Sequence, residues 1–116
     1  MKAYVISDGE YCTIEFAAHR ATAQSAGANE LDTEFQYVTC RRAPEFDKYA
    51  EQRKVPWKVL IEEHGWAQEC GFCYRRVYSD EPGRVYENDQ AFCSVSCREK
   101  AEERAVKYGL NKDAGK

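Results

Sequence analysis

Apolar and polar residues follow a mixed pattern in the first half of the chain. An apolar run at 4–6, an Asp-Gly turn pair and an alternating segment at 11–16 predict a β-hairpin. The alanine-rich segment 18–31 contains no proline and favours a helix, and alternation over 35–42 predicts a third strand. The small face of this helix would consist of Ala18, Ala21 and Ala28. The pattern therefore predicts a ββαβ unit over residues 1–50 and an α+β fold.

A helical pattern follows this unit. Pro44 is suited to the first turn of a short helix. From Pro56 onward, apolar or amphipathic residues recur at i, i+3, i+4 and i+7, which predicts another helix with the face Trp57, Leu60, Ile61 and His64. Gly65 then provides a C-terminal cap. We interpret residues 51–66 as a helical linker that braces the N-terminal unit against the part that follows.

Six cysteines divide into two isolated residues and two close pairs. Cys12 and Cys40 stand alone on strand-like segments and are expected to be buried thiols. The other four form the pairs Cys70/Cys73 and Cys93/Cys97. Zinc takes four ligands at tetrahedral corners, and four thiolates satisfy it without water in the shell. The spacing therefore predicts a structural Zn²⁺ site that is held by these four residues.

Residues beside the cysteines leave further hypotheses open. His64 lies six residues before Cys70 and either joins the metal shell or ends a helix, where its side chain suits the helix dipole. Gly71 is expected to supply the backbone angles that a Cys-x-x-Cys turn requires. A redox role for Cys70 and Cys73 is disfavoured, because a second pair stands at zinc spacing.

The residues between and after the cysteine pairs predict a compact module. Segments 74–79 and 84–87 are typical of strands around a turn, and a charged helix is expected over 96–108. A treble-clef arrangement consists of a zinc knuckle, here the Cys-x-x-Cys turn at 70–73, followed by a hairpin and a helix that carries the last ligand. We assign residues 67–110 to this zinc-finger module and residues 111–116 to a loose tail.

Two resemblances to known families add to this picture. Cys-x-x-Cys followed by Phe92-Cys93-Ser94 and Cys97-Arg98 resembles zinc fingers of the MYM, FCS and TRASH type over about residues 68–108. That resemblance implies a structural zinc and a Phe-Cys-Ser strand end that leads into a helix. The first half, with its segment 42–47, resembles small uncharacterised proteins of bacteriophages and prophages, which implies an origin but no activity.

Composition and charge exclude several classes of function. The chain carries 17 lysines and arginines against 20 aspartates and glutamates, a net charge of −3, whereas polyanion binders usually show a basic excess. No apolar run approaches the about 20 residues of a membrane helix, and the acidic start does not fit a signal peptide, so we expect a cytoplasmic protein without membrane contact. We find no phosphate loop, serine nucleophile motif or histidine grouping beside the cysteines, and therefore expect no enzymatic activity.

Two functions remain for the zinc-held surface. The first is a non-enzymatic protein-interaction module with candidate contacts Trp66, Tyr78 and Tyr86. The resemblance to phage proteins implies that its partner is a host factor. The alternative is a nucleic-acid-binding regulator that uses the basic residues Arg75, Arg76, Arg84, Lys100 and Arg104. Acidic residues interspersed on the last helix favour the first function, since they cancel most long-range attraction to phosphates.

Overall fold

The chain divides into two compact units, Met1–Val55 and a second unit from Pro56 onward. A computed structural model describes residues 1–108, so the tail assigned to residues 111–116 lies outside the described part. The helix that was assigned to the linker belongs to the second unit, where its residue Ile61 is fully buried in the core. Within residues 1–108, no helix combines the length and the apolar character needed to cross a membrane.

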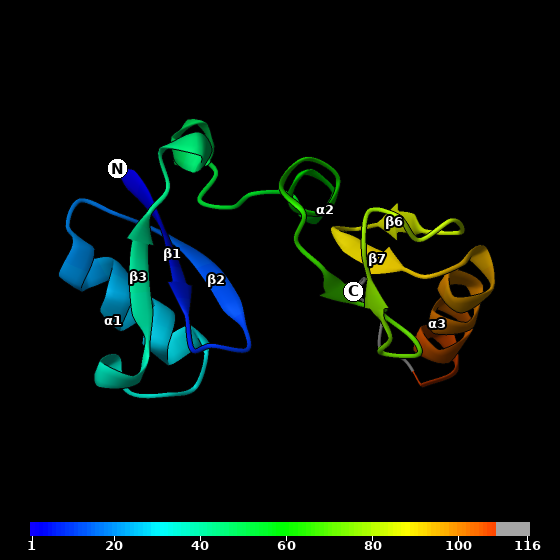
Figure 1. Cartoon of the computed structure of the whole chain (residues 1–116). Helices are drawn as coiled ribbons and strands as arrows, with labels where there is room; N and C mark the ends of the chain where they lie inside the picture. Colours follow the sequence, from blue (N-terminus) through cyan, green and yellow to red (C-terminus); the bar gives the residue numbers. More distant parts are fainter. Residues whose placement is uncertain (109–116) are drawn as a thin grey trace. The chain divides into compact units, whose positions relative to one another are not determined.

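The N-terminal unit is a three-stranded antiparallel sheet with a helix on one face (Figure 1). Its elements are β1 (Lys2–Ser7), β2 (Cys12–Ala17), α1 (Arg20–Glu30), the 3₁₀ turn η1 (Phe35–Tyr37), β3 (Thr39–Arg42) and the 3₁₀ turn η2 (Pro44–Tyr49). The strand order is β2-β1-β3, and Ile6 of the central strand is paired with Thr13 on one side and Cys40 on the other. This arrangement is the predicted ββαβ unit and agrees with the α+β class.

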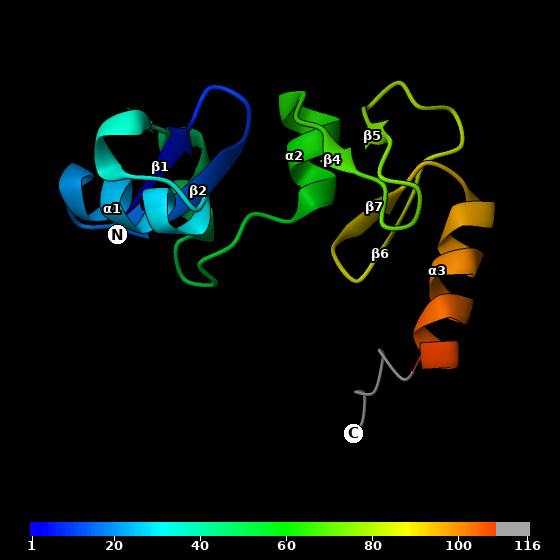
Figure 2. The ribbon, with the colours of Figure 1, turned by 90° about the horizontal axis from the view of Figure 1, so that it is seen from below.

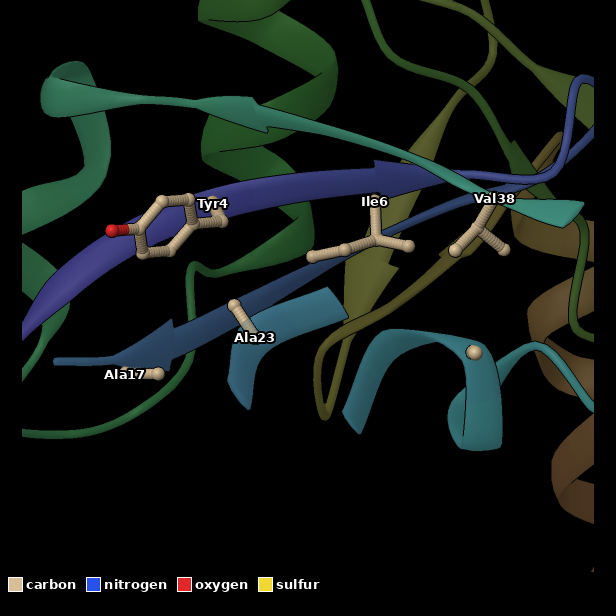
Figure 3. Close-up of a cluster of buried hydrophobic side chains, with 6 residues drawn as sticks. Tyr4, Ile6, Ala17, Ala23 and Val38 are labelled. Carbon is tan, nitrogen blue, oxygen red and sulfur yellow. The ribbon is translucent and has the colours of Figure 1, made fainter. Parts of the chain in front are cut away.

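The core of this unit lies between the sheet and α1 (Figure 3). It consists of the buried side chains of Tyr4, Ile6, Ala17, Ala23, Ala28 and Val38. The predicted small face was wrong in part, because Ala18 precedes the helix and is exposed, and Ala21 is also exposed. The helix instead buries Ala23, Gly27 and Ala28.

Two further expectations for this unit need correction. Residues 35–37 form a 3₁₀ turn instead of the first half of a strand, and the Gln24 side-chain amide holds this segment by donating to the carbonyls of Phe35 and Val38. Cys12 is exposed at the start of β2 and Cys40 is only half-buried. Cys12 lies at the end of a strand and Cys40 lies on an edge strand, so both thiols are less buried than the alternating pattern predicts.

A charged cluster fastens η2 and β3 to the central strand. The Arg42 guanidinium donates to both oxygens of Asp47, at 2.9 and 2.6 Å, and to the carbonyl of Ala3 at 3.1 Å. The backbone N–H of Ala3 donates to the same Asp47 carboxylate at 2.8 Å. The hydrogen bonds from Arg42, and next that from Ala3, hold the pKa of Asp47 below its usual range.

We expect Asp47→Asn to destabilise the N-terminal unit in a pH-dependent way. A carboxyl whose pKa is lowered on folding contributes stability above its unfolded pKa of about 3.9, and this contribution is lost as the pH falls. Amide hydrogen exchange in β1 should therefore show the largest difference between wild type and variant near neutral pH. The difference should close as the pH falls below about 4 and through the lowered pKa of Asp47 in the folded protein.

The matched control for this prediction is Glu45→Gln. Glu45 forms only an exposed ion pair with Arg41, at 3.4 Å, and such pairs contribute little. An equal loss of protection in both variants, or a difference for Asp47→Asn that does not change with pH, would contradict the role given to Asp47.

Over residues 56–108, the second unit consists of a first helix, two short hairpins and a final helix (Figure 2). Its elements are α2 (Trp57–His64), β4 (Gln68–Glu69), β5 (Arg76–Val77), β6 (Val85–Glu87), β7 (Gln90–Phe92) and α3 (Val95–Tyr108). The strands pair as β4-β5 and β6-β7, both antiparallel. A core of Ile61, Cys70, Val77, Ala91 and Phe92 joins these elements.

The pairing of the strands differs from the predicted hairpin around residues 80–83. β6 pairs with the strand that follows it, and the turn between them contains Asn88 and Asp89 with φ of 54° and 63°. Two consecutive residues with positive φ are typical of the tight turn that matches the twist of a hairpin, and asparagine and aspartate tolerate that conformation well. This Asn-Asp pair is the sequence signal for the hairpin that the structure contains.

Candidate metal centre

The structure brings the two cysteine pairs together. Cys70 and Cys73 lie in the turn between β4 and β5, Cys93 follows β7, and Cys97 lies in the first turn of α3. All four sulfur atoms lie within 4.8 Å of one another. Cys93 Sγ is 3.7 Å from Cys73 Sγ and 3.5 Å from Cys97 Sγ. The four thiols thus surround one point.

These separations fit zinc. Four sulfurs at about 2.3 Å from a tetrahedral Zn²⁺ are separated from one another by about 3.8 Å. Such a shell uses every coordination position, so zinc would be held by thiolates alone. His64 is the last residue of α2, and the cluster found among the described residues contains only the four cysteines.

The turn that carries the first pair is built by its own backbone. The N–H of Cys70 donates to the carbonyl of Arg75 at 2.8 Å, and the N–H of Tyr74 donates to the carbonyl of Cys70 at 3.1 Å. The N–H groups of Phe72 and Cys93 point at the Cys70 sulfur, both at 3.5 Å. Burial raises the pKa of the Cys70 thiol, but backbone N–H donors, including these two, outweigh burial and lower it to about 6.

The Cys97 thiol shows how the neighbouring sulfurs affect one another. The hydrogen bond with Cys93 raises the pKa of Cys97 to about 11, because neighbouring sulfurs cannot all carry negative charge at this spacing without compensation. A bound dication supplies that compensation and displaces the proton. Arg75 adds a nearby positive charge, and its pKa is raised by hydrogen bonds to Glu81 and then to the Cys93 sulfur.

Gly71 has a different role from the one predicted. The left-handed residue of this turn is Tyr74, with φ of 67°, and Gly71 is absent from the residues with positive φ. A Cβ atom on Gly71 would lie 2.7 Å from a ring carbon of Phe92 and 2.8 Å from the Gln90 side chain. The glycine is therefore required by the close approach of β7.

Each residue of the Phe-Cys-Ser segment has a separate structural role. Phe92 is buried in the core of the unit, and Cys93 provides a sulfur to the cluster. Ser94 precedes α3, and its hydroxyl accepts the backbone N–H of Cys97 at 3.1 Å, as an N-cap residue does. The segment thus joins core packing, metal ligation and helix initiation in three consecutive positions.

Two glutamines that the sequence analysis missed join the hairpins beneath the cluster. The Gln68 side-chain oxygen accepts the N–H of Ala91 at 2.8 Å, and the Gln90 amide donates to the carbonyl of Glu69 at 2.9 Å. These bonds hold β4 beside β7, and therefore the first cysteine pair beside the second. No sequence pattern marks a glutamine for such a task.

A further contact fixes α2 to the second hairpin. The Glu62 carboxylate accepts hydrogen bonds from the Arg84 guanidinium, one of them at 2.9 Å, and from the Tyr86 hydroxyl. Arg84, and next Tyr86, lower the pKa of Glu62 to about 2. At the other end of α2, the Asp89 carboxylate accepts the Trp57 N–H at 2.7 Å. Glu62 and Asp89 thus place α2 against the hairpin from both ends.

Several of the residues proposed for binding partners are engaged in contacts within the second unit. Of the candidate protein contacts, Tyr78 is exposed, whereas Trp66 packs edge-on against Trp57 and Tyr86 is engaged with Glu62. Of the candidate nucleic-acid contacts, Arg84 is paired with Glu62 and Arg75 with Glu81, and Arg76 also has a contact of its own. Lys100 and Arg104 lie together on α3 beside Phe72.

Comparison with known proteins agrees with this geometry. Residues 59–104 match the family model zf-FLZ, described as a zinc-finger of the FCS-type, C2-C2. The matched segment contains all four clustered cysteines. This segment fits a zinc finger. The match and the cluster together support Zn²⁺ as the cofactor and confirm the predicted likeness to FCS-type fingers, while the predicted likeness of the first half to phage proteins finds no support. Searches of curated proteins and of solved structures gave no match.

Proposed function

We propose that the second unit is a treble-clef zinc finger that works as a non-enzymatic protein-interaction module. The observation that carries this proposal is the cluster of four sulfurs within 4.8 Å, because four thiolates fill the coordination shell of zinc. A catalytic zinc keeps a position open for water or substrate, and this ligand set offers none. The metal would therefore stabilise a binding surface and would take no part in a chemical reaction.

Charge supports a protein partner over a nucleic acid. The arginines at 75 and 84 are already paired with carboxylates of the same unit. A Zn²⁺ ion with four thiolates adds two negative charges to a chain whose net charge is −3. Long-range attraction to a phosphate backbone is therefore weak. An origin in a phage, a host factor as the partner and a cytoplasmic location remain predictions of the sequence.

A peptide selection tests the proposed function. A random peptide library displayed on mRNA would be selected against the zinc-loaded full chain, with counter-selection against Cys97→Ser. We expect peptides whose binding requires zinc, because the metal holds the knuckle and α3 together. Cys12→Ser is the matched control, since that exposed cysteine lies outside the cluster, and it should bind the same peptides.

Two results would contradict this function. One is a selection without any zinc-dependent peptide. The other is a gel shift with mixed DNA and RNA that is micromolar or tighter and collapses both with salt and in the triple variant Arg75/Arg76/Arg84→Ala. The second result would establish the nucleic-acid alternative.

A further inference from the structure

A shallow, open groove of about 280 Å³ lies between the zinc knuckle, which is the turn over residues 70–73, and the second half of α3. Phe72, between the two cysteines of the knuckle, forms one wall. The other wall is formed by the α3 residues Lys100, Glu103, Arg104, Lys107 and Tyr108. The basic residues recur at i, i+4 and i+7 and therefore share one face of the helix.

The cations of this groove differ from three arginines elsewhere in the unit. Arg75, Arg84 and Arg98 form ion pairs with carboxylates, whereas none of the ion pairs in the described part of the chain uses Lys100, Arg104 or Lys107. They lie over aromatic rings instead. The Arg104 guanidinium carbon is 4.3 Å from the centre of the Phe72 ring, and Lys100 Nζ is 5.9 Å from it. Three cations and one carboxylate leave the groove with positive charge.

We propose that this groove binds a short acidic segment of a partner protein, which deepens and rests on the interaction function proposed above. Carboxylates would pair with Lys100, Arg104 and Lys107, and apolar side chains of the segment would pack on Phe72 and Tyr108. Tyr108 is exposed and available for such packing.

The extent of the charge favours a peptide over a nucleic acid. From Lys100 to Lys107 the cations span about two turns of helix, about 10 Å, which suits two or three carboxylates. A phosphate backbone would extend beyond this stretch, and its binding needs a longer run of cations than the groove offers. The terminal residues 109–116 carry two lysines and one aspartate, so their charge does not complement the groove.

The groove also depends on the metal. Phe72 is fixed by the turn of Cys70 and Cys73, whereas α3 is fixed by Cys93 and Cys97. Zinc therefore joins the two walls. From the sequence alone, Lys100, Arg104 and Lys107 form a basic stripe at helical spacing that suits nucleic-acid contacts. Phe72 and Tyr108 carry no such signal, because the groove exists only once the knuckle lies against α3.

Fluorescence anisotropy with the full zinc-loaded chain tests the proposal. The probe is a fluorescein-labelled peptide of alternating glutamate and leucine, and its counterpart has glutamine in place of glutamate. We expect the acidic peptide to bind and the glutamine peptide not to bind. Lys100→Gln and Arg104→Gln should each weaken binding about fivefold, as expected for loss of one exposed charge pair.

Arg98→Gln is the matched control, because it removes one positive charge from the same helix but from a residue that is paired with Glu87. Zinc content and circular dichroism would verify the fold of each variant. Absence of acidic-peptide binding, equal binding of the glutamine peptide, or equal weakening by Arg98→Gln would overturn the proposal. So would tighter binding of a labelled oligothymidylate that requires Lys100 and Arg104.

These failures are distinguishable from failure of the interaction function. Zinc-dependent peptides that lack acidic residues, or that bind Lys100→Gln and Arg104→Gln as well as wild type, would overturn the groove and leave the interaction function standing. A selection that yields no zinc-dependent peptide would overturn the function itself.

Discussion

Chelation of zinc should unfold the second unit and leave the N-terminal unit folded. The core of the second unit contains few side chains, and one of its fully buried members, Cys70, is itself a metal ligand. Loss of the metal would therefore remove cohesion from the centre of this core. Structural zinc contributes on the order of 10 kcal/mol to the folding of small modules, far more than so small a core supplies.

The chain offers a convenient probe for this experiment. Both of its tryptophans, Trp57 and Trp66, lie in the second unit, with ring centres 5.9 Å apart, so tryptophan fluorescence reports on that unit alone. On chelation we expect a large change in fluorescence and loss of amide protection across residues 68–108. Protection in β1 and α1 should remain.

Cysteine variants provide the matched comparison. Cys73→Ser and Cys93→Ser should reproduce the effect of chelation, whereas Cys12→Ser should not, since Cys12 is exposed and outside the cluster. Elemental analysis should find about one zinc per chain in wild type and in Cys12→Ser. Unchanged protection of residues 68–108 after complete removal of the metal would refute this account of stability.

The metal site was predictable because residue type and spacing along the chain are enough to identify metal ligands. Two close cysteine pairs need no knowledge of the fold to indicate zinc. The strand pairing was not predictable in the same way, because the residues at 80–83 and the Asn88–Asp89 pair are both plausible turns. Of the two, only Asn88 and Asp89 lie between two strands that are hydrogen-bonded to each other. Hairpin partners are decided by tertiary packing as well as by turn residues.

The contacts that support the site were the least predictable. Gln68, Gln90 and Glu62 act across gaps of more than twenty residues, and their side chains carry no periodic signal. Gly71 was singled out for its backbone angles, whereas the structure constrains it through the side chains of Phe92 and Gln90 on β7. Gly27 in the N-terminal unit is likewise constrained by a residue that is distant in the sequence and not by its own helix.

Gly27→Ala should destabilise the N-terminal unit, although alanine is the better helix former. A Cβ atom at position 27 would lie 2.6 Å from Ile6 Cβ and 2.7 Å from both Ile6 Cγ atoms. Rotation about χ1 moves the Cγ atoms but leaves Cβ in place, so a new rotamer cannot relieve the contact. Ile6 is fully buried on the central strand, which is paired on both sides. The helix and the sheet must therefore move apart.

The sign of this effect follows from comparing two magnitudes. Replacing glycine by alanine inside a helix stabilises by up to about 1 kcal/mol, whereas overpacking a closed core costs about 1–3 kcal/mol. We therefore expect a lower free energy of unfolding, measured as faster amide exchange in β1 and α1, with tryptophan fluorescence of the second unit unchanged. Ser25→Ala, an exposed substitution on the same helix, should change stability by less than about 0.5 kcal/mol. If Gly27→Ala were as stable as wild type or more stable, α1 would not lie as close to Ile6 as this core requires.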